Sequence, residues 1–391
     1  MAALSALTVG ALVTGLTGCS GGNPLLPGDA TQDSLDANVS SRIESAVADA
    51  MALSGSTAAI VGVWKGDDAY VQGFGDGVDA NSKIRAAQAS QPVMCALLLD
   101  LVAKGTVSLD REVSADLPRQ VGIEDITYGQ LCQAQSGLAD FKARIADIFA
   151  NNPTRQWPEG ELLAQSLARS PVSRAADSAH PSDANTLLLA RALRTATGGD
   201  TSSLLHDHVF TKAGMSSTTY PQNPLTDVTV PGLMTGQTRE FAGGDPVCDV
   251  EAVAVPEVSP SMLSGAGATV TTVTDLKSFY EHYLNGDFGG DAASLITQTL
   301  PVSDTRDWGF GLEKVGPLYG MTGAMTGTIT AAYRDPASGF SVVVALNDST
   351  AGAGFARILA VELAAAAGAN VPWSAEEQAE NLSKRAVCPA G

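Results

Sequence analysis

The chain has 391 residues, 45% of them hydrophobic and 17% charged, and its formal net charge at pH 7 is −19. This composition is typical of a folded protein with a large core and excludes a disordered chain. The acidic balance leaves no basic surplus to neutralise phosphates, so we expect no nucleic-acid partner. It also argues against attachment to an anionic lipid surface by electrostatics alone.

The N-terminal run is small, apolar and uncharged, and it ends in L-T-G immediately before Cys19. This ending resembles the lipobox of a bacterial lipoprotein signal, although no Lys or Arg precedes the apolar run. The run suits a signal peptide and is short for a membrane-spanning helix. The resemblance implies that residues 1–18 are removed and that Cys19 carries a lipid anchor on the outer face of a bacterial membrane, in the cell envelope. The alternative is an unprocessed apolar tail with an incidental cysteine.

A tether, a helix and a hairpin are expected next along the chain. Residues 19–39 are rich in Gly, Pro, Asp, Asn and Ser, which predicts a flexible tether. The apolar residues of 41–53 have helical spacing. Two β-rich runs at 57–64 and 69–74 predict a pair of strands.

A buried helix follows, and the rest of the chain is organised around it. Residues 93–99 are apolar on every side, which predicts a helix enclosed by a large domain. Ser90 is expected to cap the first turn of this helix through its hydroxyl. Pro92 fits the first turn because a missing N–H costs little there.

The second half of the chain alternates between helical, irregular and strand-like stretches. Residues 141–200 are mostly helical, and residues 221–260 are rich in Pro and Gly and irregular. The remaining expected elements are a helix at 273–284, strands that open near Trp308 and continue at 328–333 and 340–346, a last helix at 354–365 and a tail at 368–391.

The segments beside the buried helix resemble a known family. The matching segments are Ile84-Arg85, Lys104-Gly105, Ser108-Leu109-Asp110 and Leu117-Pro118, and further ones lie at 126–138, 208–215, 264–284 and 308–312. Their order is similar to that of the serine β-lactamase and penicillin-binding-protein family, especially its class C and D-Ala-D-Ala carboxypeptidase branch. There, the buried helix carries an F-R-x-x-S-x-x-K segment and is followed by a Gly and an S-L-D-D run.

The resemblance covers about residues 40–367 and implies an α+β fold of the β-lactamase/transpeptidase type. In that fold an antiparallel sheet is flanked by helices, and an all-helical region is inserted between the second and third strands. The α/β part is expected at about 40–82 and 300–367, and the helical insert at about 84–299. The tail at 368–391 lies beyond the usual end of the family.

Three motifs of the family are changed at the residues that move protons. Gln88 stands at the position of the nucleophilic Ser and Gln91 at that of the Lys base. An amide is a poor nucleophile and takes no proton near neutral pH. Pro181 replaces the Tyr of the second motif, and Asp183 occupies its Asn position. Met321 stands where the third motif has Lys or His. These substitutions predict a chain that has lost the serine hydrolase reaction.

The cleft that holds the active site in the resembled family is still expected to bind a ligand in this chain. The expected cleft-lining residues are Gln88, Gln91, Ser182, Asp183, Met321, Thr322 and Gly323. The alternative is that another serine, Ser90 or Ser182, serves as the nucleophile and is activated by His180. Ser90 lies two residues along the helix from Gln88, which turns it about 200° away. The side chains of His206, Asp207 and His208 would point in three different directions on a helix and could not converge on one ion. We therefore expect no metal site and no cofactor.

Four cysteines remain when Cys19 is set aside from the five in the chain. An even number in an exported protein predicts two disulfides, with three possible connectivities, against the alternative of four free thiols. In class A β-lactamases the buried helix is bridged to an E-L-C-x-A helix, and Gln130-Leu131-Cys132-Gln133-Ala134 looks like that helix. The resemblance therefore implies Cys95–Cys132, and the other bridge is then Cys248–Cys388, which would pin the tail.

The sequence therefore favours an envelope lipoprotein that is anchored to the membrane through Cys19 and is a pseudoenzyme of the family. Its ligand is expected to be a peptidoglycan fragment or an envelope protein. Two alternatives stay open. One is an active esterase, amidase or carboxypeptidase with a non-standard nucleophile, and the other is a purely structural interaction protein.

Overall fold

The computed structural model describes residues 32–172, 174, 178–221, 230–265 and 267–389. Residues 1–18, Cys19 and part of the expected tether at 19–39 lie outside the described residues. Within the described ranges no helix is both long enough and apolar enough to cross a membrane.

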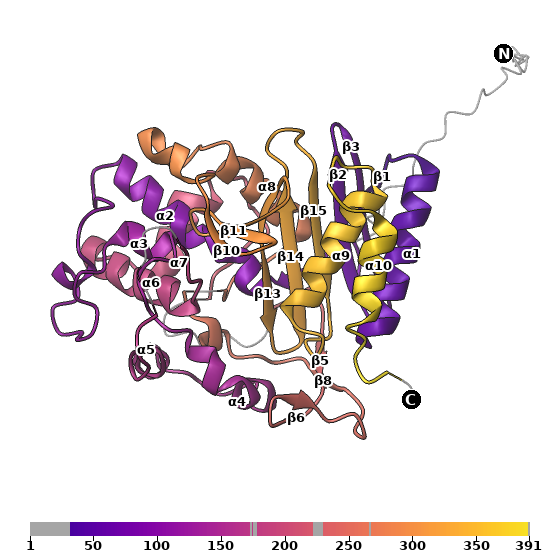
Figure 1. Cartoon of the computed structure of the whole chain (residues 1–391), viewed down its shortest axis with the longest axis horizontal. Coiled ribbons are helices and arrows are strands. Elements are labelled where there is room, and N and C mark those ends of the chain that lie inside the picture. The colour runs from indigo at the N-terminus through magenta and orange to yellow at the C-terminus, as the bar shows by residue number, and fades with distance from the viewer. Residues whose placement is uncertain (1–31, 173, 175–177, 222–229, 266, 390–391) are drawn as a thin grey trace, which may run out of the picture.

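A nine-stranded antiparallel sheet forms the centre of the described part of the chain (Figure 1). Its strand order is β1-β3-β2-β15-β14-β13-β12-β11-β10. The strands are β1 (Gln32–Asp33), β2 (Ala59–Lys65), β3 (Asp68–Phe74), β10 (Leu300–Ser303), β11 (Arg306–Trp308), β12 (Glu313–Val315), β13 (Leu318–Met325), β14 (Thr328–Arg334) and β15 (Ser341–Leu346). The sheet thus combines strands from before and after the insert, which confirms the expected α+β fold.

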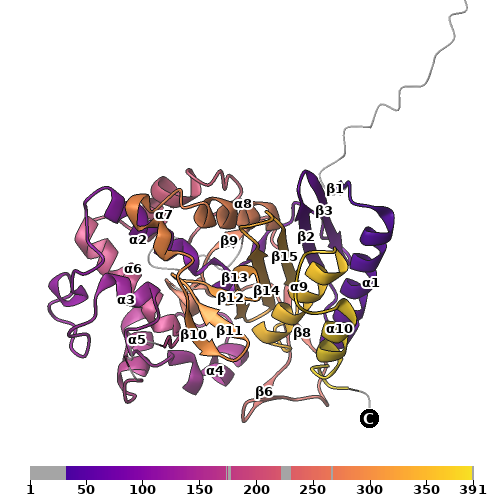
Figure 2. The same cartoon turned by 45° about the horizontal axis from the view of Figure 1, so that its top comes forward.

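Helices from both ends of the chain cover one face of the sheet. These are α1 (Ala37–Ser54), α9 (Ala353–Ala366) and α10 (Ala375–Ser383), which lie side by side in Figures 1 and 2. Asp36 caps α1 by accepting the Asn38 N–H, and Gly55 ends it with φ 77°. The apolar sides of these helices pack on the alternate residues of β2, β14 and β15 and form one of the two large cores.

The insert covers the other face and holds the second large core. Its helices are α2 (Pro92–Ala103), α3 (Tyr128–Cys132), α4 (Ala146–Asn151), α5 (Glu159–Leu167), α6 (Asp183–Thr197), α7 (Thr201–Leu205) and α8 (Val273–Leu284). Short helical turns join them: η1 (Ala87–Ser90), η2 (Val113–Ala115), η3 (Phe141–Arg144), η4 (His206–Phe210), η5 (Pro260–Leu263) and η6 (Gly290–Leu295).

The expectation that the insert is all-helical is wrong. It contains three two-stranded ladders: β4 (Ile84–Arg85) with β9 (Val270–Thr271), β5 (Gly236–Thr238) with β8 (Val253–Val255), and β6 (Phe241–Ala242) with β7 (Asp245–Pro246). The first ladder joins the entry of the insert to a segment near its exit. The other two use the backbone donors and acceptors of the Pro- and Gly-rich stretch, which forms no helix.

The central helix α2 is buried as expected, from Pro92 at its first turn to Leu101. The predicted cap by Ser90 is wrong, because its hydroxyl donates to the Ala87 carbonyl at 2.9 Å. The chain enters α2 through η1, and Gln91 at the N-cap has helical dihedrals of −54° and −38°. A capping side chain needs an extended backbone at that position, and η1 does not provide one.

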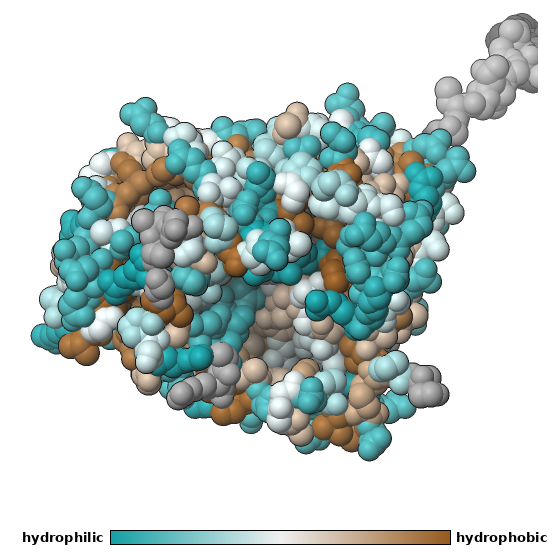
Figure 3. All heavy atoms as spheres, viewed as in Figure 1, coloured by the Kyte–Doolittle hydropathy of each residue, from teal (hydrophilic) through white to brown (hydrophobic). Residues whose placement is uncertain are grey.

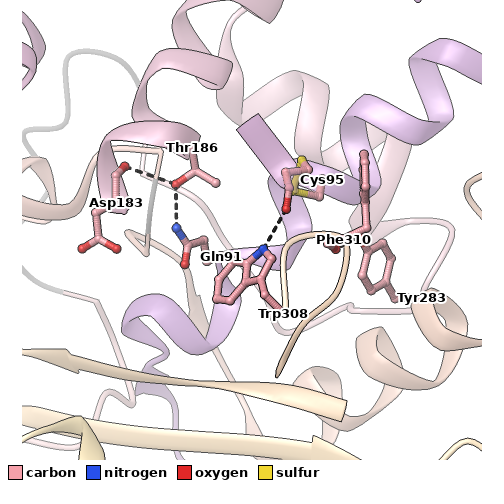
Figure 4. Close-up of a disulfide and its surroundings, with 8 residues drawn as sticks. Gln91, Cys95, Asp183, Thr186, Tyr283, Trp308 and Phe310 are labelled. Carbon is pink, nitrogen blue, oxygen red and sulfur yellow. Dashed lines mark hydrogen bonds between the residues drawn. A yellow bond between two sulfur atoms is a disulfide. The ribbon is translucent and has the colours of Figure 1, made fainter. Parts of the chain in front are cut away.

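Both disulfides implied by the resemblance are confirmed. Cys95–Cys132 joins α2 to α3 with Cα atoms 5.8 Å apart, and both cysteines are buried (Figure 4). Cys248–Cys388 joins an exposed loop of the insert to the tail, with Cα atoms 5.4 Å apart. The alternative connectivities and the four free thiols are therefore wrong.

Candidate active site

The turn that carries Gln88 lies against the open edge of β13. Strand β12 pairs with β13 only as far as Gly320, so the following residues of β13 have no strand on that side. Gly323 is the point of closest approach, because a Cβ there would lie 2.3 Å from the Gln88 backbone N. Ala87 before Gln88 has φ 46°, a conformation that a non-glycine residue adopts only where its surroundings hold it. The close packing of η1 on β13 thus fixes the position of the Gln88 side chain.

The Gln88 amide bridges two elements and is 3% exposed. Its Nε2 donates to Asp183 Oδ2 at 2.7 Å, and its Oε1 accepts the Ala324 backbone N–H at 2.9 Å. Both ends of the amide are therefore satisfied by the protein. The Ala324 N–H lies at the strand edge that faces η1, where an acyl-transfer enzyme would place a donor for an oxyanion. In this chain the Ala324 N–H already donates to the side-chain carbonyl of Gln88.

Gln91 is also tied to α6 and not to a reacting group. Its Nε2 donates to Thr186 Oγ1 at 3.1 Å, and the Thr186 hydroxyl lies 3.4 Å from the Asp183 carbonyl oxygen (Figure 4). Gln91 is 3% exposed, so this bond satisfies a buried amide group. The two glutamines at the positions of the family's Ser and Lys thus join α6 to the start of α2.

A lysine from another part of the chain enters the site. Lys142, in η3, lies 2.7 Å from Asp183 Oδ2 through its Nζ. Burial disfavours the charged form of Lys142, but the carboxylates of Asp183 and Asp140 outweigh this and raise the pKa of the ammonium. Burial, helped by the charge of Asp183, raises the pKa of Asp140. The site therefore holds a protonated lysine between two carboxyl groups, and no motif in the sequence marked Lys142 for this place.

The residues of the alternative hydrolase, Ser90, Ser182 and His180, do not form a nucleophile–base pair in the structure. Ser182 caps α6, where its hydroxyl accepts the Ala184 N–H at 3.2 Å. The Ser90 hydroxyl is 1% exposed and is bonded to the Ala87 carbonyl. The ring of His180 lies 3.5 Å from the Ser178 hydroxyl, and Pro181 between His180 and Ser182 has no proton to transfer.

The third motif is divided between the two faces of β13. Met321 is half-buried and packs with Trp308, Ala134 and Ala179. Thr322 points to the opposite face, where Arg357 Nη2 donates to its hydroxyl at 3.1 Å. Thr322 was expected to line the cleft, and the structure does not bring it there, because alternate residues of a strand face opposite sides.

The side chains of His206 and His208 contact different partners in the structure. His206 pairs with its neighbour Asp207 at 2.8 Å, whereas His208 pairs with Asp100 at 2.6 Å. Lys104 and Lys212 also contact Asp100, and these donors lower the pKa of its carboxyl to about 2 although burial opposes the shift. Among the described residues, no three His, Cys, Asp or Glu side chains are grouped so that they could hold a metal ion.

A pocket of about 320 Å³ opens beside Lys142 and Ala324. In Figure 3 the face of the molecule is hollowed at its centre, between the places of β13 and α4 in Figure 1. The remaining lining is mainly apolar and includes Ala146, Phe149, Ala150, Phe241, Met262, Leu263 and Met325. Lys142 and Asp147 are its charged lining residues, so such a pocket accepts an apolar group of modest size next to these two charges.

The comparisons with known proteins agree with this fold. A family profile described as Beta-lactamase matches residues 43–366. A D-stereospecific amidohydrolase from Streptomyces sp. superposes with TM-score 0.70 at 22% identity, over 80% of this chain and 94% of that one.

Two further solved structures are similar. The D-amino acid amidase from Ochrobactrum anthropi SV3 has TM-score 0.67 at 20% identity, over 80% of this chain and 93% of its own. The octameric penicillin-binding protein homologue from Pyrococcus abyssi has TM-score 0.71 at 17% identity, over 87% of this chain and 80% of its own. At these identities the similarity shows a common fold, and the profile match over most of the chain shows that this protein belongs to the Beta-lactamase family.

Proposed function

We propose that this protein binds a ligand in the cleft beside Gln88 and does not hydrolyse it. The observation that carries the proposal is the Gln88 amide, which stands at the nucleophile position and uses the Ala324 N–H that an oxyanion would need. A reaction through a covalent acyl intermediate requires a nucleophile and a base to take its proton, and Gln88 and Gln91 provide neither. In other hydrolases the loss of these groups lowers turnover by about 10⁶-fold.

The ligand we favour is a peptidoglycan fragment, presented to a protein that is held in the cell envelope by a lipid on Cys19. The pocket of about 320 Å³ has room for one amino-acid side chain beside the Lys142–Asp183 pair. Two of the similar structures are a D-stereospecific amidohydrolase and a D-amino acid amidase, which supports a ligand that contains D-amino acids. An envelope protein that inserts a side chain into the same pocket is the other partner of this proposal.

Intact-mass spectrometry tests the loss of hydrolysis. The folded protein from Ser20, with both disulfides formed, is incubated with penicillin and separately with a fluorophosphonate. We expect no covalent adduct, whereas an active penicillin-binding protein treated in parallel gains the mass of the acyl group. An adduct mapped to a single serine would overturn the proposal and establish an active hydrolase with that nucleophile.

Binding is tested by calorimetry with purified muropeptides. The variant Ala150→Phe fills the pocket from α4 and is expected to abolish binding. Ala164→Phe adds the same bulk at an exposed position of α5 and is the matched control. Equal binding by the two variants would show that the ligand sits elsewhere, and no binding by the wild-type protein would exclude cell-wall fragments as the ligand.

A further inference from the structure

A second, larger pocket lies behind β13, on the side away from Gln88. It has a volume of about 640 Å³ and is lined by residues of β11, β12, α9 and the tail. The tail supplies Pro372, Trp373, Glu377, Gln378 and Asn381. The family match ends at residue 366, so one wall of this pocket is built by a segment outside the family profile. The pocket is therefore a feature of this chain and not the cleft of the family.

Two arginines are held at one wall of this pocket by a buried carboxylate. Glu313 is 1% exposed and accepts Arg306 Nη1 at 3.0 Å and Arg357 Nε at 3.0 Å. The hydroxyl of Tyr333 also donates to Glu313. Two guanidinium groups thus share one carboxylate, which leaves an excess of positive charge. A guanidinium held in this way is already oriented before a ligand arrives.

Both arginines retain donors for a ligand. Arg357 uses its Nε and Nη2 for Glu313 and Thr322, while Arg306 uses one Nη1 bond. Within the described part of the chain, Arg357 Nη1 and Arg306 Nη2 make no bond to the protein. The two side chains are 27% and 31% exposed and both line the pocket. A planar carboxylate can be bound by such N–H groups from two arginines.

The same lining also carries negative charge. Asp304 and Glu377 are exposed lining residues, and Asp307 is half-buried. Trp373 also lines the pocket and is fixed by its indole N–H, which donates to the Val361 carbonyl at 2.8 Å. The ring packs over Gly316, where a Cβ would lie 2.7 Å from it. The lining thus combines three cationic side chains (Arg306, Arg357 and Lys314), three carboxylates and an aromatic surface.

We propose that this pocket binds a short peptide in its zwitterionic form. The C-terminal carboxylate lies on Arg306 and Arg357, the terminal ammonium lies near Asp304, Asp307 or Glu377, and an apolar side chain contacts Trp373. A simple anion fits less well because three carboxylates line the pocket, and a simple cation fits less well because of the two arginines and Lys314. The volume is that of pockets which hold ligands of a few residues.

Titration calorimetry of the folded chain from Ser20 with three forms of alanyl-phenylalanine tests the proposal. The free dipeptide has both charges, the N-acetyl form lacks the ammonium, and the C-terminal amide lacks the carboxylate. We expect the free dipeptide to bind and each modified form to bind at least about tenfold more weakly, since each loses a charged hydrogen bond. Equal binding of the N-acetyl form, or no binding of the free dipeptide, would overturn the proposal.

Variants locate the binding. Arg306→Gln keeps the Glu313–Arg357 pair and is expected to weaken dipeptide binding about tenfold. Arg155→Gln breaks a surface pair with Glu161 and is the matched control with unchanged binding. Ala150→Phe, which fills the pocket beside Lys142, should also leave dipeptide binding unchanged, so this test is separate from that of the first cleft. If Arg306→Gln binds like the wild type, or if Ala150→Phe abolishes binding, the assignment to the pocket behind β13 is wrong.

Discussion

The two sides of β13 have kept very different polar groups. On the η1 side, Gln88 replaces a reactive residue and Lys142–Asp183 is the ion pair of the site. On the α9 side, Glu313 still holds Arg306 and Arg357 in a fully connected cluster. The first cluster stands where a reaction would need proton transfer, whereas the second joins β12, β13, β14 and α9. Strand β13 thus separates a candidate binding site on one of its faces from a charged cluster that ties the sheet to α9 on the other face.

The largest effect is expected when the cluster on the α9 side is broken. Glu313→Ala leaves two half-buried guanidinium groups and the Tyr333 hydroxyl without their acceptor. We expect it to lower the free energy of unfolding by about 3–5 kcal/mol, as for other buried charges that lose their partner. Urea unfolding followed by circular dichroism measures the change. Glu380→Gln removes an exposed pair with Lys384 and should leave the stability almost unchanged. Similar losses of stability in the two variants would show that the buried cluster around Glu313 contributes no more than an exposed ion pair.

Breaking the pair on the η1 side should have a smaller effect. Asp183→Asn removes the carboxylate beside Lys142 but keeps an acceptor oxygen for Gln88. We expect a loss of about 1–3 kcal/mol. Because the attraction of Asp183 is lost while the burial remains, the pKa of Lys142 should fall, which NMR of ¹⁵N-labelled lysine side chains can follow. A pKa of Lys142 that stays the same would show that Asp140 alone sets the charge of this site.

Glu362 differs from Glu313 and Asp183 because it is a buried carboxyl group with no cationic partner among the described residues. It lies on α9, is 6% exposed, and its Oε2 has no hydrogen-bond partner among the described residues. Burial, with a contribution from the charge of Asp49, raises the pKa of its carboxyl to about 7. The folded protein therefore keeps a proton that the unfolded chain releases above about pH 4.3.

This raised pKa makes stability fall as the pH rises from about 4 to 7, and above that window the full penalty remains. Glu362→Gln removes the ionisation. It should stabilise the protein by roughly 1–2 kcal/mol at pH 8, after allowance for solvent screening, and have little effect at pH 4. Thermal unfolding at the two pH values is the measurement. An effect of the same size at both values would show that packing, and not charge, explains the variant.

An effect of similar size to that of Glu362→Gln is expected at Gln88 itself. Gln88→Ala removes the bridge between Asp183 and Ala324 at a cost of about 1–2 kcal/mol, the usual range for buried hydrogen bonds. Gln88→Ser restores a hydroxyl but no base beside it, because Gln91 remains bonded to Thr186. We expect no acylation of this variant by penicillin in intact-mass spectra. Acylation of Gln88→Ser would show that Lys142 or Asp183 can act as the base, and that the site has lost only its nucleophile.

The sequence predicted the elements whose pattern is local and strong. Helix α8 has the predicted bounds, and α9, β14 and β15 begin and end within a residue or two of their predicted bounds, since each has a continuous apolar face. Both disulfides followed from the family resemblance. The helix α10 was not predicted because its residues are mostly polar and it is placed by contacts with α9 and by the Trp373 bond.

The parts of the site that were missed depend on contacts between distant segments. Lys142 carries no local signal, and only the folded position of η3 brings it to Asp183. The orientation of Thr322 depends on the register of β13, which a three-residue motif does not define. The hydrogen bonds of Gln88 need both α6 and β13 in place, so the sequence could show that a glutamine stands at the family's nucleophile position but not what that glutamine contacts.

The bond between Cys248 and Cys388 closes a covalent ring of chain with a sequence separation of 140 residues. That ring contains β10 to β15, α9 and the tail that forms one wall of the second pocket. A protease that cuts one peptide bond inside the ring cannot release either piece, because the disulfide still joins them. In an extracellular setting rich in proteases, this protein would survive a single cut in that half of the chain as one covalent molecule.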